Sequence, residues 1–264
     1  MHYSTFAKKA IAPSITILCL GCIALLQNSR LAEISAQATQ PKSETEQAQI
    51  LAQEEASLAF LKRLPAFGFD NVIADWSFLR FLQYFGDGTA RRQTGYALSP
   101  KYFDVILDRD PRFVKPYLFL SVSTSLYAGK ADQSVALMNK GLQYLTPQSS
   151  SDVYLVWLYK ATDELLFLGD VKAAQASFEK AAEWAKATEE PDKQQAATVA
   201  AKTAKFLATN PNSKKAQISA WLMVLTNAVE DESRQKAINN IQRLGGQVTF
   251  APDNRVSIQF PEDD

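Results

Sequence analysis

The chain of 264 residues is nearly free of cysteine and histidine. Its two cysteines, Cys19 and Cys22, lie in one apolar run near the N-terminus, and its single histidine is His2. The rest of the chain therefore has no disulfide, no thiol nucleophile and no histidine for a catalytic triad, a metal site or haem attachment. No glycine-rich loop with its lysine is present to bind phosphate. We expect no metal and no cofactor.

The chain also lacks an excess of charge and has little glycine or proline. Its 28 lysines and arginines balance its 28 aspartates and glutamates, and the basic residues are scattered along the chain. This pattern does not indicate a nucleic-acid partner. The 10 glycines and 11 prolines lie mostly between apolar runs of helical period. Long uninterrupted helices, and hence an all-α fold, are predicted.

The first residues have the pattern of an export signal or a membrane anchor. Lys8 and Lys9 precede an uncharged apolar run, residues 10–26, which is close to the shortest length that spans a bilayer as a helix, roughly 17 residues. We expect residues 1–29 to remain as an apolar anchor helix with the lysines on the cytoplasmic side. Cleavage after Ala38 with secretion, and acylation of Cys22 in a lipoprotein, stay open as alternatives. Each outcome places the body of the protein on the exported side, in a periplasm or lumen.

Residues 152–187 carry the clearest motif. Gly169 separates two apolar helical patterns, and Ala174, Phe178 and Ala181 of the second share one helix face. Two of these three residues are small, which lets a neighbouring helix approach closely. This is the packing of a stacked helical hairpin.

The motif resembles the tetratricopeptide repeat (TPR). Residues 112–147 resemble it too, with Gly129 at the turn and with Ser134, Met138 and Gly141 on the packing face. The resemblance implies a right-handed stack of antiparallel helix hairpins, which we expect over residues 44–245. It also implies that another protein binds in the concave groove, as a peptide or a helix. The groove candidates, taken from the first helix of each hairpin, are Tyr117, Ser121, Thr124, Tyr154, Tyr159 and Lys160.

Residues 68–87 are dense in aromatic side chains. In one interpretation they form a core helix, with Asp75 paired to an arginine and with Val72, Trp76, Leu79 and Phe81 packed inward. In the other they form a docking surface, because large aromatic residues dominate interface hot spots. The docking candidates are Trp76, Phe78 and Tyr84.

The same segment is similar to one that follows the anchor in membrane-anchored TPR-containing proteins of bacteria. The shared order is Gly68-Phe69, then Ala74-Asp75-Trp76, then Tyr84-Phe85-Gly86. The similarity implies location and fold, and no activity.

Two further segments flank the helical part. Residues 30–43 are polar and predict a linker, and Ser43 with Glu46 forms a capping box for a helix that ends before Pro65. Alternating apolar residues within 246–264 predict a small β-hairpin followed by an acidic tail. Because two strands alone are only marginally stable, we expect this hairpin to lean on the last helices, and pairing with a partner's strand is the alternative.

These features predict a membrane-tethered, exported protein-interaction scaffold that is not an enzyme. Its expected role is to assist the assembly or stability of a membrane or envelope complex. One alternative is a carboxylate-dependent enzyme acting on glycans, since glycosidase chemistry needs only two carboxylates at a set separation. Another is a structural protein that forms homo-oligomers through the aromatic segment. The carboxylates available to the enzyme are Asp70, Asp75, Asp87, Asp104 and Asp108.

Overall fold

The computed structural model describes residues 21–22, 43–188, 190–226, 228, 231–250 and 256–262. The chain divides into two units, residues 1–49 and residues 50–264. Most of the predicted anchor and linker, together with Ala38, lies outside the described residues. Among the helices that are described, none combines the length and the apolar character needed to cross a membrane.

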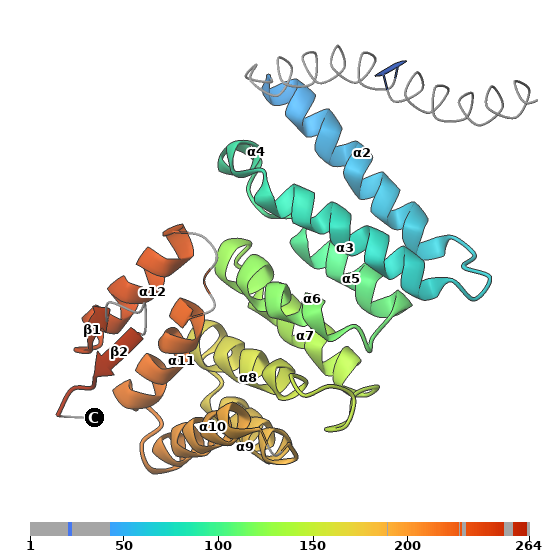
Figure 1. The fold of residues 1–264 in the computed structure, drawn as a ribbon. Helices are drawn as coiled ribbons and strands as arrows, with labels where there is room; N and C mark the ends of the chain where they lie inside the picture. Colours follow the sequence, from blue (N-terminus) through green and yellow to red (C-terminus); the bar gives the residue numbers. More distant parts are fainter. Residues whose placement is uncertain are drawn as a thin grey trace, which may run out of the picture. The chain divides into compact units, whose positions relative to one another are not determined.

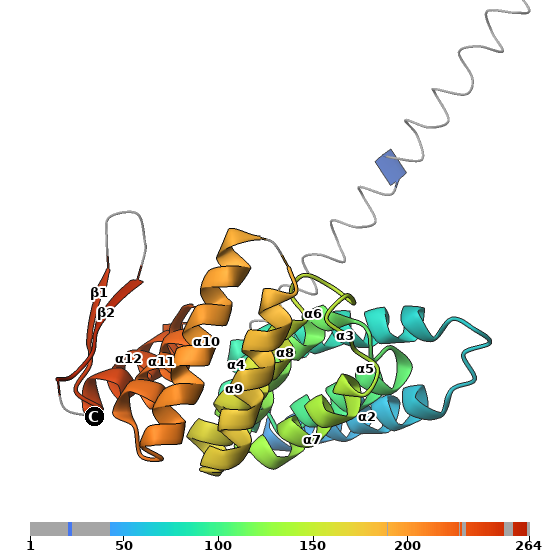
Figure 2. The same cartoon turned by 90° about the horizontal axis from the view of Figure 1, so that it is seen from below.

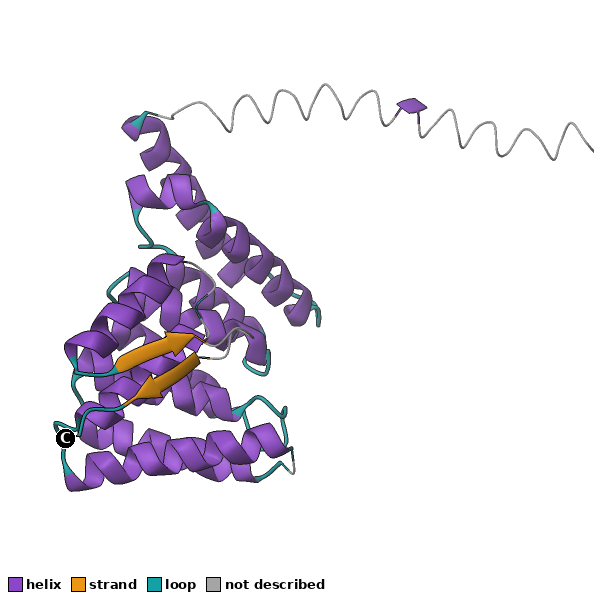
Figure 3. Cartoon of the chain, turned by 60° about the vertical axis from the view of Figure 1, so that its left-hand side comes forward, coloured by secondary structure: helices purple, strands orange, loops and turns teal. Residues whose placement is uncertain are grey.

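The described chain is helical, with one small sheet at its C-terminal end (Figures 1 and 3). The predicted all-α class with a terminal hairpin is confirmed at this level. Two π-helical segments, η1 and η2, continue helices α6 and α8. The elements are α2 (Glu44–Arg63), α3 (Asp70–Gly86), α4 (Gly88–Thr94), α5 (Ser99–Arg109), α6 (Val114–Leu120), η1 (Ser121–Tyr127), α7 (Ala131–Leu142), α8 (Tyr154–Asp163), η2 (Glu164–Leu168), α9 (Val171–Lys186), α10 (Pro191–Thr209), α11 (Lys214–Thr226), α12 (Asp231–Arg243), β1 (Gln247–Phe250) and β2 (Val256–Gln259).

Consecutive helices pack against one another along the chain. Helix α3 packs on α5, α8 on α9, α9 on α10, and α11 on α12. Figure 2 shows α3 and α6 in one layer, with α5 and α7 in the other. Helix α6 also packs on α8, so the first helices of neighbouring pairs lie side by side.

Helix starts and turns follow the local chemistry of the sequence. The capping box is confirmed: the Ser43 amide donates to Glu46 Oε2 at 2.9 Å, and the Glu46 amide donates to Ser43 Oγ at 3.2 Å. Gly129 and Gly169 follow the two π-helical segments with φ of 66° and 69°. Only glycine adopts this left-handed backbone at little cost, which explains both turn positions.

The two helical repeats pack as their small residues predict. Phe178 and the two alanines of its face, Ala174 and Ala181, are buried in a cluster with α10 and α11. In the other repeat, Met138 and Gly141 are buried beside Tyr117 of α6. Helix α4 was not predicted; Asp87 begins it by accepting a hydrogen bond from the Ala90 amide at 3.0 Å.

The C-terminal strands form an antiparallel pair that leans on the last helices. Val248 lies opposite Ile258, and both pack against the cluster that contains Trp221 and Ile241. The expected packing on helices is therefore confirmed. The turn of the hairpin, residues 251–255, lies outside the described residues.

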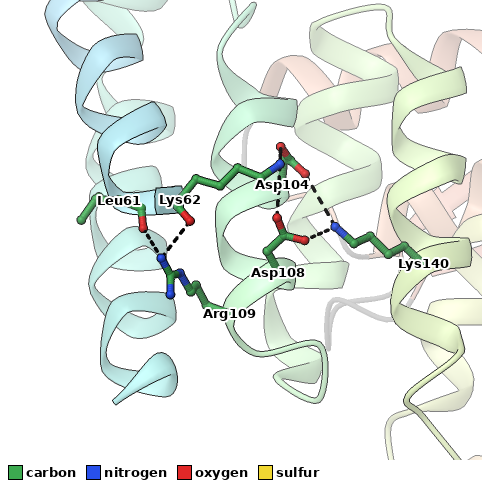
Figure 4. A network of polar contacts seen from close by, with 6 residues as sticks. All are labelled: Leu61, Lys62, Asp104, Asp108, Arg109 and Lys140. Atoms are coloured by element: carbon green, nitrogen blue, oxygen red, sulfur yellow. Dashed lines mark hydrogen bonds and ion pairs between the residues drawn. The ribbon is translucent and has the colours of Figure 1, made fainter. Parts of the chain in front are cut away.

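Ion pairs link helices α2, α5 and α7 in series (Figure 4). Lys62 of α2 and Lys140 of α7 each pair with both Asp104 and Asp108 of α5. Burial acts to raise the pKa of Asp108, but hydrogen bonds from Lys140 and Lys62 outweigh it, so the pKa is lowered. The two lysines neutralise the two aspartates. Asp104 and Asp108 therefore serve to link the three helices.

Helix α3 is apolar on two faces, and the core-helix interpretation is right for only one. Phe81 is buried as expected, with its ring centroid 4.6 Å from that of Phe103. Val72, Trp76 and Leu79, which were expected inside, are each more than half exposed. Helix α3 meets α5 and α6 on one side. The side that carries Val72, Trp76 and Leu79 is not covered by any helix among the described residues.

The expected pairing of Asp75 with an arginine is also wrong. Asp75 is exposed, and in the described part of the chain it forms no ion pair. Arg80, the arginine of α3, instead pairs with Glu54 and donates to Ser57 Oγ at 2.6 Å, both on α2. The choice follows from the helical spacing, because Arg80 projects from the side of α3 that α2 covers.

Candidate peptide-binding groove

A groove of about 420 Å³ lies between α8, α10 and α11. Its walls are mainly apolar, and one of them carries Val199, a valine that is 47% exposed. An apolar groove that is only partly closed fits the side chains of a bound peptide or helix better than a small polar metabolite. The apolar residues that line it are Leu155, Leu158, Phe178, Ala196, Val199, Ala200, Ala220, Leu222 and Met223.

One end of the groove is polar. Lys193 Nζ lies 2.6 Å from Asp152 Oδ1 and 3.3 Å from Asp192 Oδ2, and 5.7 Å from the ring centroid of Tyr154. The hydrogen bond to Asp152 raises the pKa of Lys193 against the opposing effect of burial. Two carboxylates around one ammonium leave this end with a surplus negative charge.

Helix α8 also ties the groove to α11. The Thr162 hydroxyl contacts the Met223 sulfur at 3.6 Å, and the same hydroxyl donates to the Leu158 carbonyl at 2.9 Å. The Thr162 hydroxyl thus links α8 to α11 of the next helix pair along one wall of the groove.

No family model, no curated protein and no solved structure matches the chain. The groove and its surroundings are therefore interpreted from their own geometry.

Of the six groove candidates chosen from the sequence, only Tyr154 lines this groove. The other five are buried: the Tyr117 hydroxyl donates to the Pro111 carbonyl at 2.8 Å, and Thr124 and Tyr159 lie in the interior. Ser121 and Lys160 belong to buried polar clusters. The prediction that these five line an open groove is wrong, because their side chains face neighbouring helices: Tyr117 packs beside Gly141 of α7, Ser121 donates to Asp163 of α8, and Lys160 donates to Ser177 of α9.

The residues that form the groove left a weak signal. Leu155 and Leu158 lie three positions apart on α8, which is also the spacing of a core stripe. The opposite face of the same helix is equally apolar. Periodicity alone therefore could not tell the wall of the groove from the core.

The first polar cluster joins η1, α7 and α8 through a fully buried carboxylate. Asp163 accepts hydrogen bonds from three serine hydroxyls: Ser121 and Ser125 at 2.6 Å each and Ser134 at 2.7 Å. Burial raises the pKa of Asp163 to about 6, although the three hydroxyls act to lower it. The Asp163 side chain thus accepts hydrogen bonds from hydroxyls of both η1 and α7. These bonds fix the position of α8 relative to the preceding helix pair.

The second polar cluster joins α8 to α9. Lys160 and Glu164 form a buried ion pair one helical turn apart. Ser177 of α9 accepts from Lys160 Nζ at 2.9 Å and donates to Glu164 Oε2 at 2.6 Å. Because each charged group has two partners, the cost of burying the pair is reduced.

Both clusters lie where an α-helix widens into a π-helix. Ser121 and Ser125 belong to η1, and Glu164 begins η2. At the end of η2 the Asp170 amide donates to the Glu164 carbonyl, six residues earlier, at 2.9 Å. This hydrogen bond spans the turn at Gly169. π-Helical segments are rare and often mark functional sites; here the same device precedes the turn glycine of both repeats.

The docking candidates on α3 divide between core and surface. Phe78 and Tyr84 are buried, and the Tyr84 hydroxyl accepts from the Leu98 amide at 3.2 Å. Trp76 is 56% exposed. The lipidation candidate Cys22 is an exposed free thiol.

Most of the carboxylates considered for an enzyme have structural partners. Asp70 pairs with Arg109 at 2.9 Å, Asp87 caps α4, and Asp104 and Asp108 share Lys62 and Lys140. In the described part of the chain no group of three or more acidic, histidine or cysteine side chains could hold a metal ion.

Proposed function

We propose that the chain is a TPR-like scaffold that binds an apolar peptide or helix of another protein in the groove between α8, α10 and α11. The observation that carries this proposal is a partly open apolar groove whose lining includes the half-exposed Val199 of α10 together with Leu155 and Leu158 of α8. The size of the groove and its mainly apolar lining are those of common ligand-binding sites in proteins. The helical hairpins supply a rigid frame that holds the walls apart.

The charge at one end of the groove suggests the polarity of the ligand. Asp152 and Asp192 outnumber Lys193. We infer that the bound segment carries a basic residue, or its own N-terminus, at this end. The remaining contacts are apolar.

We further propose that the scaffold is membrane-tethered on the exported side and assists a membrane or envelope complex. The support is the sequence of residues 1–29, with Lys8 and Lys9 ahead of an uncharged run. Retention, cleavage and acylation of this segment predict different masses for the mature N-terminus, which mass spectrometry of the purified protein distinguishes.

A matched pair of substitutions tests the groove. Val199→Glu places a charge on the apolar wall, whereas Ala201→Glu places the same charge on another exposed face of α10. The tagged full chain, recovered from gently solubilised native membranes, should lose a stoichiometric partner with Val199→Glu and keep it with Ala201→Glu. Equal recovery of the partner with both variants would contradict the proposed site.

A further inference from the structure

The connection between α2 and α3 presents three phenylalanines to solvent. Phe67 is 88% exposed, Phe69 is 66% exposed, and Phe60 on the last turns of α2 is 63% exposed. We call these three residues the phenylalanine tip. The connection between α2 and α3 lies at one end of the helical unit, and α12 lies at the other (Figures 1 and 2).

The backbone of the tip is strained at its most exposed residue. Phe67 has φ of 48°, and among the described residues it alone, apart from glycines, has a positive φ. A bulky residue in this region is disfavoured relative to glycine. Glycine would adopt this backbone at lower cost, so neither backbone preference nor burial accounts for a phenylalanine at this position.

Arg109 of α5 holds the two ends of the tip segment together. Arg109 donates to the carbonyl oxygens of Leu61 and Lys62 at 2.7 and 2.8 Å (Figure 4). It also donates to the Leu64 carbonyl at 2.6 Å and pairs with Asp70 at 2.9 Å. These bonds tie the last turn of α2 to the first turn of α3. The exposed rings therefore project from a fixed loop.

The charge around the tip is mainly positive. Arg63 is exposed at the end of α2, and Arg112 is exposed three residues beyond Arg109. The acidic residues here are engaged locally: Asp70 by Arg109, and Asp110 by the Arg112 amide at 3.0 Å. The three arginines of these segments, Arg63, Arg109 and Arg112, thus exceed the two aspartates, Asp70 and Asp110, by one positive charge.

We propose that the phenylalanine tip binds the surface of an anionic phospholipid bilayer. The rings enter the boundary between headgroups and acyl chains, and Arg63 and Arg112 pair with lipid phosphates. Charge complementarity favours this occupant over a second copy of the chain, because two copies would bring like charges together. The predicted anchor, residues 10–26, would bring the chain as a whole to a bilayer.

This contact is separate from the groove and shares only the membrane tethering with the proposed function. It would orient the scaffold at the membrane. Loss of the contact should leave the effect of Val199→Glu on partner recovery unchanged. The two proposals can therefore fail independently.

The test uses the full chain reconstituted in vesicles, with Cys19 and Cys22 replaced by serine. A bimane probe on Pro65→Cys reports on the tip, and one on Gln242→Cys reports on an exposed position of α12. In vesicles that contain brominated phosphatidylserine, we expect the bromine to quench the probe at position 65 and to leave the probe at 242 unquenched. Phe67→Ser with Phe69→Ser should reduce quenching at 65 to the level of the control position.

The charge requirement is tested in the same system. Arg63→Glu with Arg112→Glu, or replacement of the anionic lipid by brominated phosphatidylcholine, should also remove most of the quenching. Because all four side chains are exposed, thermal unfolding followed by circular dichroism should be unchanged. Equal quenching at positions 65 and 242, or quenching that survives the two serine substitutions, would overturn the proposal. Shielding from aqueous iodide that rises with protein density, without bromine quenching, would identify a second copy and overturn it as well.

Discussion

The hydroxyl of Tyr117 fills the space where a side chain at position 141 would begin. A Cβ added to Gly141 would lie 1.6 Å from Tyr117 Oη and 2.5 Å from its Cζ. The ring cannot withdraw freely, because it is fully buried and its hydroxyl donates to the Pro111 carbonyl. The closest approach of α6 to α7 therefore depends on the absence of one methyl group.

Gly141→Ala should destabilise the protein by about 1–3 kcal/mol, the usual cost of overpacking, despite the better helix propensity of alanine. Urea unfolding of the full chain in detergent, followed by circular dichroism, measures this. Gly86→Ala is the matched control, since nothing lies within 4 Å of a Cβ at that position. If the two variants unfold at the same urea concentration, the close contact with Tyr117 does not limit packing.

Asp163 should make stability depend on pH. Its pKa is raised to about 6 in the folded protein, from the ordinary value of 3.8. The folded state therefore binds the proton more tightly, and this contribution is present below pH 4 and lost as pH rises through about 6. The expected loss is on the order of 3 kcal/mol. In Asp163→Asn, the free energy of unfolding should not show this fall when it is measured from pH 4 to 7.5. If the free energy changes with pH in the same way in both proteins, Asp163 is not the source of the pH dependence.

The buried pair of Lys160 and Glu164 should be strongly coupled. Lys160→Met leaves Glu164 buried without its cation, at a cost of about 3–5 kcal/mol. Replacing both residues, as Lys160→Met with Glu164→Leu, should cost clearly less than the sum of the single changes. A double-mutant cycle in urea measures the coupling, and additive effects would show that the two charges do not depend on each other.

Arg109 and Lys140 should differ in their contribution to stability although both form ion pairs. Arg109 is largely buried and donates to three carbonyls and a carboxylate, so Arg109→Met should cost about 2–3 kcal/mol. Lys140 lies at the surface, and Lys140→Met should change stability by less than about 1 kcal/mol. The midpoint of urea unfolding compares them directly. A larger loss for Lys140→Met would mean that the ion pairs across α2, α5 and α7 stabilise the stack more than surface pairs usually do.

Local chemistry made much of the fold predictable. The capping box at Ser43, the turns at Gly129 and Gly169 and the alternation around Val248 each depend on a few neighbouring residues. Their backbone consequences do not need the rest of the molecule. The same reasoning missed α4, because its signals, Asp87 and Gly95, bound a stretch without a clear apolar period.

The faces of the helices could not be assigned in the same way. Tyr159 and Leu158 are adjacent and both apolar in character, yet one is in the core and the other lines the groove. Which face is covered depends on helices far away in the sequence, such as α10 and α11. The serine hydroxyls that converge on Asp163 come from two separate elements, and no local pattern brings them together.

The most direct test of the scaffold places a photoreactive amino acid in the groove of the full chain in native membranes. At position 199 it should give one defined adduct with another protein, and at position 201, on another face of the same helix, it should give none. The adduct at 199 should disappear when Leu158→Glu places a charge on the facing wall. No adduct at 199, or the same adducts at 199 and 201, would contradict a binding groove between α8, α10 and α11.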